Sequence, residues 1–243
     1  MVHRHFLFWK HVMKKNIKDI VILIICLLII IAVFVFGMVY IKPAADAITL
    51  MDKGFRNLNQ VNVYAGVKNG RGFIFDVEDS YLYILTSKHL VSEENQVTVE
   101  FGNKGKVEAE VVYYFVDNDA ALIRVKREDS DLHLKGAKGV VPLTKEEYEH
   151  MPLNKNVFYA TDIYDTSLEV RTGKWYSSLE YIYELGESAG IFLGEVVPGM
   201  SGGALYDEED RLVGMIIAAD ETKGAVIPSY VLDEEYKKFK GNE

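Results

Sequence analysis

The sequence predicts an all-β domain that follows one apolar N-terminal helix and ends in a short C-terminal helix. From residue 61 onward, short runs rich in β-branched and aromatic residues alternate with turn residues, whereas residues 20–41 form one uninterrupted apolar stretch. The runs fall into two groups of about six strands with a break near residues 135–142, which fits two packed β-barrels or a sandwich. We therefore expect four segments: a basic segment 1–19, a transmembrane helix 20–41, a connector 42–60 and a folded domain 61–243.

The apolar stretch is long enough to cross a membrane. Residues 20–41 include no charged side chain, and a helix of about 20 apolar residues spans the hydrocarbon layer. A buried helix of this length in a soluble protein would show a polar stripe. A cleaved signal peptide is the alternative, because residues 45–47 resemble a small-x-small cleavage site, but its apolar region would run only about 7–15 residues. We expect an uncleaved signal anchor.

The charges on either side of this stretch predict its orientation. Of the basic residues near it, only Lys42 follows closely, and the others precede it: Arg4, Lys10, Lys14, Lys15 and Lys18. An excess of positive charge holds a flank in the cytoplasm. We therefore expect a single-pass protein of the cell membrane, anchored in the lipid bilayer, with a cytoplasmic N-terminus and the folded domain outside.

Charge and cysteine content exclude several functions. Residues 1–42 carry six basic residues and one acidic residue, a charge of +5. Because the whole chain has a net charge of −9, the remaining residues carry −14. A domain this acidic has no general affinity for nucleic acid. The single cysteine, Cys26, lies within the apolar stretch, which leaves the folded domain without a disulfide or a cysteine-based metal site. We expect no metal and no cofactor.

Turn and helix signals divide the folded domain further. Hairpin turns are predicted at residues 69–70, 102–103 and 207–210, and the Asn-Gly pair at 69–70 is the strongest of these signals. Helical spacing of apolar residues indicates two short helices, at residues 145–150 and 229–240.

The segment 198–205, PGMSGGAL, places Ser201 on a glycine-rich turn. A serine nucleophile needs an activating base and backbone N–H groups that stabilise the oxyanion of the tetrahedral intermediate. An ordinary tight turn between two strands is the alternative. The segment also fits the G-x-S-x-G pattern of α/β-hydrolases, but there the histidine follows the serine, and none of the six histidines of this chain follows Ser201. Any histidine base must therefore precede the serine.

Two further motifs precede the serine in the order His, Asp, Ser. His89 ends the strand-like run 83–91, and Asp119 opens the run 117–125. The patterns Thr-x-x-His, Asn-Asp-x-x-Leu-Ile and Gly-x-Ser-Gly-Gly resemble those of the trypsin-like (chymotrypsin-fold) serine proteases. They are most similar to the bacterial HtrA/Deg type. The resemblance covers residues 60–235 and implies two packed six-stranded antiparallel β-barrels.

The resemblance also implies a role for each motif residue. Ser201 would attack the scissile carbonyl, His89 would accept its proton, and Asp119 would orient the imidazole. The backbone N–H groups of Gly199 and Ser201 would form the oxyanion hole. An extended polypeptide substrate would pair with one strand, whose apolar side chains suggest an apolar P1 residue. The residues of that strand are Met215, Ile216, Ile217 and Ala218.

Alternatives and departures accompany these assignments. Asp117 competes with Asp119, and the motif residues could instead be a core histidine, a capping aspartate and a turn serine. Met200 replaces the aspartate that receives the new amino terminus in animal zymogens of this family, so that route of activation is not expected. The chain ends at Glu243, so we do not expect the PDZ domain that usually follows in HtrA-like proteins.

The combined expectation is a membrane-anchored serine endopeptidase that cleaves exposed or misfolded proteins outside the cytoplasmic membrane. A catalytically silent, peptide-binding relative is the first alternative. A signalling protease with one specific partner is the second.

Overall fold

The computed structural model describes Ile29 and residues 59–93, 96–101, 105–128, 139–162, 169–183, 186–220 and 222–242. The chain divides into two compact units, Met1–Thr49 and Leu50–Glu243. The predicted basic segment 1–19, transmembrane helix 20–41 and connector 42–60 lie outside the described residues, apart from Ile29 and residues 59–60. In the part of the chain that is described, no helix combines the length and the apolar composition needed to cross a bilayer.

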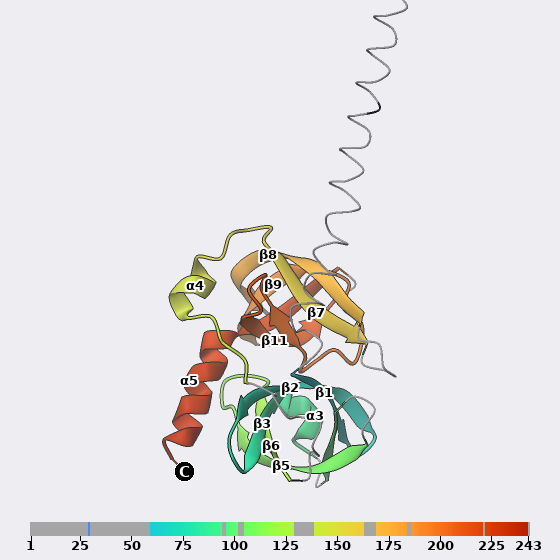
Figure 1. Cartoon of the computed structure of the whole chain (residues 1–243). Coiled ribbons are helices and arrows are strands. Elements are labelled where there is room, and N and C mark those ends of the chain that lie inside the picture. Colours follow the sequence, from blue (N-terminus) through green and yellow to red (C-terminus); the bar gives the residue numbers. More distant parts are fainter. Residues whose placement is uncertain are drawn as a thin grey trace, which may run out of the picture. The chain divides into compact units, whose positions relative to one another are not determined.

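Six antiparallel strands close into the first barrel of the second unit, in the order β1-β2-β3-β6-β5-β4 (Figure 1). The strands are β1 Gln60–Ala65, β2 Lys68–Val77, β3 Tyr81–Thr86, β4 Val97–Glu100, β5 Lys106–Tyr114 and β6 Ala121–Lys126, and a short helix, α3 Lys88–Val91, follows β3. Side chains alternate between the two faces of a strand. On β1 this alternation buries Val61, Val63 and Ala65 in the centre of the barrel.

The second barrel repeats this construction with the order β10-β11-β12-β9-β8-β7. Its strands are β7 Asn156–Asp162, β8 Glu169–Ile182, β9 Glu187–Leu193, β10 Ala204–Tyr206, β11 Leu212–Ala219 and β12 Lys223–Pro228. Two closed six-stranded barrels confirm the predicted fold class and exclude the sandwich. The helices α4, Lys145–Glu149, and α5, Ser229–Lys240, match the two predicted helices within one residue.

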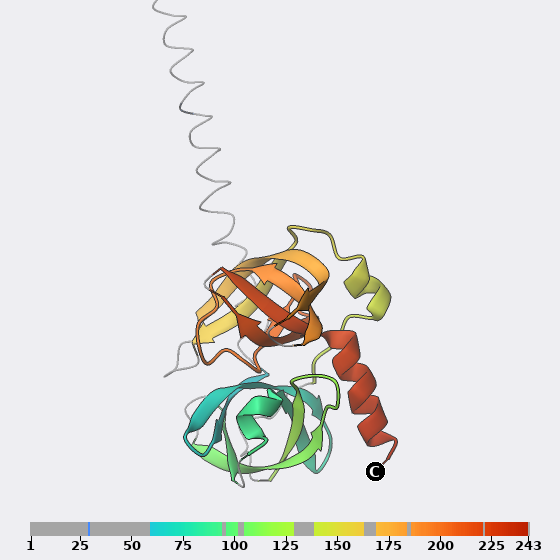
Figure 2. The same ribbon diagram turned by 180° about the vertical axis from the view of Figure 1, so that it is seen from behind.

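The two barrels share one hydrophobic cluster. It contains Phe73 and Leu122 from the first barrel and Met215 from the second. Helix α5 leaves the second barrel and runs beside the first (Figures 1 and 2), where Tyr236 joins the same cluster. The Tyr236 hydroxyl donates to Oδ2 of Asp76 on β2 at 2.7 Å. Apolar burial and this hydrogen bond therefore fix the barrels against each other, and the space between them is where a site built from both can form.

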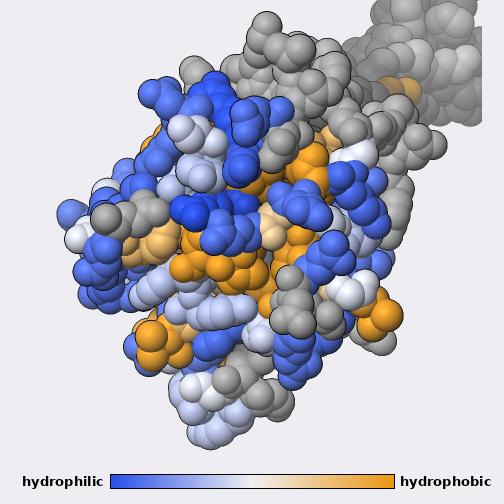
Figure 3. Space-filling view, turned by 90° about the horizontal axis from the view of Figure 1, so that it is seen from below, coloured by the Kyte–Doolittle hydropathy of each residue, from blue (hydrophilic) through white to orange (hydrophobic). Residues whose placement is uncertain are grey.

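The surface is mostly polar around this core. Figure 3 looks at the protein from the side of the first barrel, and hydrophobic residues reach the surface in the middle of that face, inside a rim of hydrophilic ones. The hydrophilic rim agrees with the strongly acidic composition.

One turn predicted in the first barrel was wrong. Asn69 and Gly70 do not form a turn but lie within β2, and the chain turns instead at residues 66–67, where Gly66 has a φ of 58°. A Cβ at Gly70 would lie 2.9 Å from Leu90 Cδ2 and 3.2 Å from the Ser201 carbonyl oxygen. Glycine is needed there for close approach to the Ser201 turn, which outweighs the turn preference of the Asn-Gly pair.

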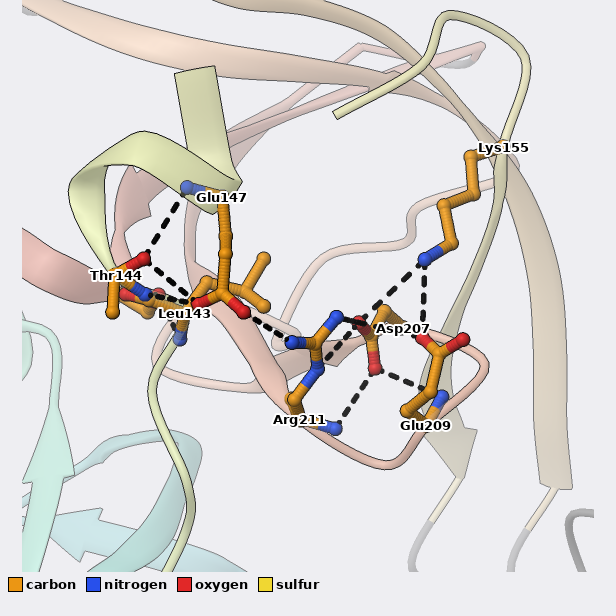
Figure 4. A network of polar contacts seen from close by, with 8 residues as sticks. Leu143, Thr144, Glu147, Lys155, Asp207, Glu209 and Arg211 are labelled. Carbon is orange, nitrogen blue, oxygen red and sulfur yellow. Dashed lines mark hydrogen bonds and ion pairs between the residues drawn. The ribbon is translucent and has the colours of Figure 1, made fainter. Parts of the chain in front are cut away.

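The predicted turn at 207–210 is confirmed between β10 and β11, whereas residues 102–103 lie outside the described residues. The fully buried carboxylate of Asp207 organises this turn, accepting hydrogen bonds from the backbone N–H groups of Glu209 and Arg211 and from the Arg211 guanidinium (Figure 4). Arg211 also donates to Glu147 of α4 at 2.7 Å. The network therefore attaches α4 to the second barrel, at the end of β10 that lies away from Ser201 in the sequence.

Candidate active site

His89 and Asp119 lie in direct contact in the first barrel. Strand β3 ends at Thr86, so His89 sits in α3 and not at the end of a strand as its sequence suggested. Asp119 precedes β6 in a loop, where its Oδ1 accepts the His89 backbone N–H at 2.9 Å and its Oδ2 lies 2.5 Å from His89 Nδ1. Asp119 therefore fixes both the backbone and the ring of His89.

The loop that carries Asp119 is closed on itself and tied to α3. The Phe115 N–H donates to the Ala120 carbonyl at 3.0 Å, and the Lys88 side chain donates to the Phe115 carbonyl at 3.0 Å. Asp117, the other candidate on this loop, is exposed. The structure thus places Asp119 and not Asp117 against the histidine.

The contact with Asp119 changes the acid strength of His89. The hydrogen bond to the Asp119 carboxylate raises the pKa of His89 above its ordinary value of 6.5, against the lowering effects of partial burial and of the Lys68 ammonium. The tautomer of His89 is also set, since Nδ1 faces a carboxylate and must carry the proton, which leaves Nε2 as the basic nitrogen.

Close backbone packing holds the turn around Ser201 against the first barrel. The Ser201 carbonyl accepts the Arg71 N–H at 3.0 Å, and the Gly202 N–H donates to the Ile216 carbonyl at 2.7 Å. Gly202 has a φ of 89°, and a Cβ there would lie 2.0 Å from the Arg71 carbonyl oxygen, so only glycine fits. Met200 is buried, and its sulfur accepts the Val197 N–H at 3.3 Å. The buried side chain of Met200 thus supports the turn from the interior of the protein.

The Ser201 hydroxyl is partly buried and donates to the Ile217 carbonyl at 3.4 Å. Among the described residues this is the hydrogen bond that the hydroxyl makes, and none joins it to His89. The structure therefore brings His89 and Asp119 together, whereas Ser201 lies in the neighbouring turn with its hydroxyl on Ile217. Long or absent contacts of this kind are common in active sites without substrate.

The turn presents two backbone donors. Gly199 has a φ of 91°. Within the described segments, the N–H groups of Gly199 and Ser201 donate to no backbone carbonyl. Backbone N–H groups on such a turn can bind an anion. These are the two donors that the family resemblance assigned to the oxyanion hole.

A cleft of about 380 Å³ opens beside Ser201. Its lining residues are mostly apolar: Val196, Val197, Pro198, Ser201, Ile216, Ala218 and Asp220. Of the four residues expected to bind substrate, Ile216 and Ala218 line the cleft, whereas the side chains of Met215 and Ile217 belong to the hydrophobic core between the barrels. The sequence did not predict the other cleft residues Val196, Val197, Pro198 and Asp220. The first three directly precede the serine turn, and that position was the signal that could have found them.

One edge of β11 is open beside the cleft. Strand β10 pairs with β11 from Leu212 to Met215, and the pairing continues only as far as Ile216, whose N–H donates to the Gly203 carbonyl. Beyond that point, within the described residues, β11 pairs with β12 alone. An extended peptide can add to such an edge. In the described part of the chain no group of three or more His, Cys, Asp or Glu side chains is arranged to hold a metal ion.

A family model described as a trypsin-like peptidase domain matches residues 70–215, more than half of the 243 residues. The chain belongs to the trypsin-like peptidase family. It is therefore a trypsin-like serine protease by family, and the resemblance inferred from its three motifs is confirmed. No curated protein matches the sequence of this trypsin-like peptidase.

Solved structures match this trypsin-like peptidase in fold. The Rv3671c protease of M. tuberculosis in an inactive form matches with 19% identity and a TM-score of 0.57, covering 77% of this chain and 91% of that one. Its active form matches with 18% identity and a TM-score of 0.58, over 74% and 80% of the two chains. A serine endoprotease from Yersinia pestis matches with 22% identity and a TM-score of 0.56, over 77% and 65%.

Proposed function

We propose that this trypsin-like peptidase is a membrane-anchored serine endopeptidase that uses His89, Asp119 and Ser201 as its catalytic triad. The observation that carries the proposal is the contact of Asp119 with His89 Nδ1, beside a turn that holds Ser201 and two backbone N–H groups. In the proposed reaction, His89 Nε2 removes the proton from the Ser201 hydroxyl as its oxygen attacks the scissile carbonyl carbon. The proton then passes from His89 to the leaving amine, and water later hydrolyses the acyl-enzyme by the same route.

The hydroxyl of Ser201 must leave the Ile217 carbonyl for this reaction. A hydrogen bond of 3.4 Å is weak, so the cost of breaking it is small compared with the gain from the oxyanion donors. The oxygen of the tetrahedral intermediate would lie against the N–H groups of Gly199 and Ser201. Removing one such donor typically reduces kcat by about 10²–10³-fold.

The substrate of the proposed enzyme is a polypeptide in extended conformation. It would pair with the open edge of β11 and place its P1 side chain in the cleft beside Ser201, where Ile216, Val196 and Ala218 favour an apolar side chain. An extended segment is accessible in exposed or misfolded proteins and not in folded ones. We assign the activity to such substrates outside the cytoplasmic membrane, because the apolar stretch 20–41 and the basic residues before it support an anchor with a cytoplasmic N-terminus.

Labelling with a fluorophosphonate tests the proposal directly. The wild-type chain in detergent or membranes should be labelled covalently at Ser201 and should hydrolyse a peptide library, whereas Ser201→Ala should lose the label and about 10⁴–10⁶-fold of the turnover. Ser188→Ala, a change elsewhere on the second barrel, serves as the control and should retain both. A wild-type protein that folds but is neither labelled nor active would instead support the catalytically silent peptide-binding alternative.

A further inference from the structure

Glu187 joins the loop that carries Asp119 to the second barrel. This residue is the first of β9 and is half-buried. Its Oε2 accepts a hydrogen bond from Asn118 Nδ2 at 3.0 Å, and its carboxylate also lies close to the backbone of Asp119. One carboxylate of the second barrel thus holds Asn118 and lies beside Asp119, two consecutive residues of a loop in the first.

This contact differs from the other hydrogen bonds of the loop. The bonds from the Phe115 N–H and from Lys88 tie the loop to itself and to α3, all within the first barrel. Ser201 belongs to the second barrel, in the turn before β10. Among the described residues, it is Glu187 that connects the loop of Asp119 by a hydrogen bond to the barrel that holds Ser201.

The carboxylates of Glu187 and Asp119 lie close together and repel each other. Burial raises the pKa of Glu187, and the charge of Asp119 raises it further, while the hydrogen bond from Asn118 and the backbone of Asp119 oppose the rise. On its own hairpin, Glu187 pairs with the apolar Ile182. The site therefore keeps two carboxylates close together despite their repulsion, which points to a role in positioning.

We propose that Glu187 is a positioning residue for the catalytic pair: it fixes Asn118 and Asp119 relative to Ser201 and so maintains the contact of Asp119 with His89 Nδ1. The inference rests on the proposed triad. The charged groups that act on His89 are Asp119, whose contact raises its pKa, and Lys68 from β2, which lowers it, so Glu187 acts on His89 only through the position of Asp119. A residue in this place acts through Asp119 and need not touch the substrate.

Two substitutions weaken the contact of Glu187 with the loop to different extents. Glu187→Ala removes both acceptors and should lower kcat by about 10²-fold with a KM within about twofold of wild type, because a misplaced catalytic pair weakens the chemical step and not substrate binding. Glu187→Gln keeps one acceptor oxygen and removes the charge, so kcat should fall by about tenfold. The acidic limb of the pH profile should also move to lower pH, since a loosened contact with Asp119 raises the pKa of His89 less.

Glu180→Gln is the matched control. Glu180 lies on the same hairpin, is exposed and pairs with Ala189, so its substitution removes the same charge without touching the Asp119 loop. It should leave kcat and the pH profile unchanged. Equal effects of the Glu180 and Glu187 substitutions, or loss of thermal stability alone with wild-type kcat and pH profile, would overturn the proposal.

NMR titration of His89 tests the inference without turnover. In Ser201→Ala protein, Glu187→Gln should lower the pKa of His89 and weaken the downfield signal of the proton between Nδ1 and Asp119, and Glu180→Gln should do neither. An unchanged His89 titration contradicts the role of Glu187 even if the protein is active. Absence of labelling and hydrolysis in the wild type contradicts the proposed function, whatever the titration shows.

Discussion

Asp119 binds His89 at two points, through the backbone N–H and through Nδ1 of the ring. Two contacts from one carboxylate set both the position and the rotation of the imidazole. The side chain of His89 is nevertheless 56% exposed, so its other face stays open to substrate and solvent. Orientation by a partner and access from solvent are the two properties that a general base requires.

Asp119→Asn should reduce kcat by about 10⁴-fold, because the amide can donate to Nδ1 and so favour the wrong tautomer of His89. Single-turnover hydrolysis of a peptide ester measures this loss. Asp117→Asn is the control, since Asp117 is exposed on the same loop and should keep wild-type activity. The reverse result would assign the orienting role to Asp117.

The activity should fall on the acidic side with a midpoint above pH 6.5. The hydrogen bond to Asp119 raises the pKa of His89, and the base must be neutral, so activity is lost as the pH falls through this raised pKa. The sign for stability is the opposite: the contact stabilises the fold below pH 6.5 and this contribution is lost as the pH rises through the raised pKa. The pH dependence of kcat/KM gives the midpoint, and His150→Gln should leave it unchanged. A midpoint below pH 6.5 would contradict this environment for His89.

Gly202 should tolerate no side chain. In Gly202→Ala the new Cβ would lie 2.0 Å from the Arg71 carbonyl oxygen at a φ of 89°, so we expect loss of folding or of the Ser201 turn, with activity reduced by at least about 10²-fold. Gly105→Ala is matched in φ, at 91°, but meets no atom within 4 Å, and should cost only about 1 kcal/mol. Thermal denaturation and peptide hydrolysis of both variants decide this. Equal effects would show that strain in φ, and not the contact with Arg71, makes glycine necessary.

The sequence predicted most of the fold because its signals are local. Strand runs, turn residues and the spacing of apolar residues at 229–240 depend on near neighbours, and they predicted the two groups of strands and α5, whereas the family resemblance favoured barrels over a sandwich. The Asn-Gly pair at 69–70 misled because its glycine serves a contact with Ser201, a residue far along the chain. Asp119 was predicted to open a strand but lies in a loop for a similar reason, since that loop is held in part by Lys88, a residue of α3.

The motif residues of the site were predicted through family resemblance, whereas its supporting contacts were not. Glu187 lies 69 residues from its partner Asn118, and no motif surrounds it. The bond from the Ser201 hydroxyl to the Ile217 carbonyl depends on where β11 bends, which the alternation of apolar residues does not encode. Contacts between elements that are distant in sequence carry the geometry of this site, and a single sequence contains no signal for them.

Asp207 should be important for stability and not for catalysis. Its buried carboxylate accepts four hydrogen bonds from the turn and from Arg211, and Lys155 lies 3.7 Å away (Figure 4). Asp207→Ala leaves Arg211 and two backbone N–H groups without this acceptor, which should reduce the free energy of unfolding by about 3–5 kcal/mol.

Glu209→Gln provides the comparison for Asp207. The Glu209 side chain is 56% exposed and pairs with Lys155 at 3.0 Å, so its loss should cost less than about 1 kcal/mol. Urea denaturation measures both changes, and kcat at a temperature where each variant is folded should equal that of the wild type, because the network lies beyond the far end of β10 from Ser201. A large loss of kcat in folded Asp207→Ala would instead show that the β10–β11 turn transmits its geometry to the nucleophile through the three residues of β10.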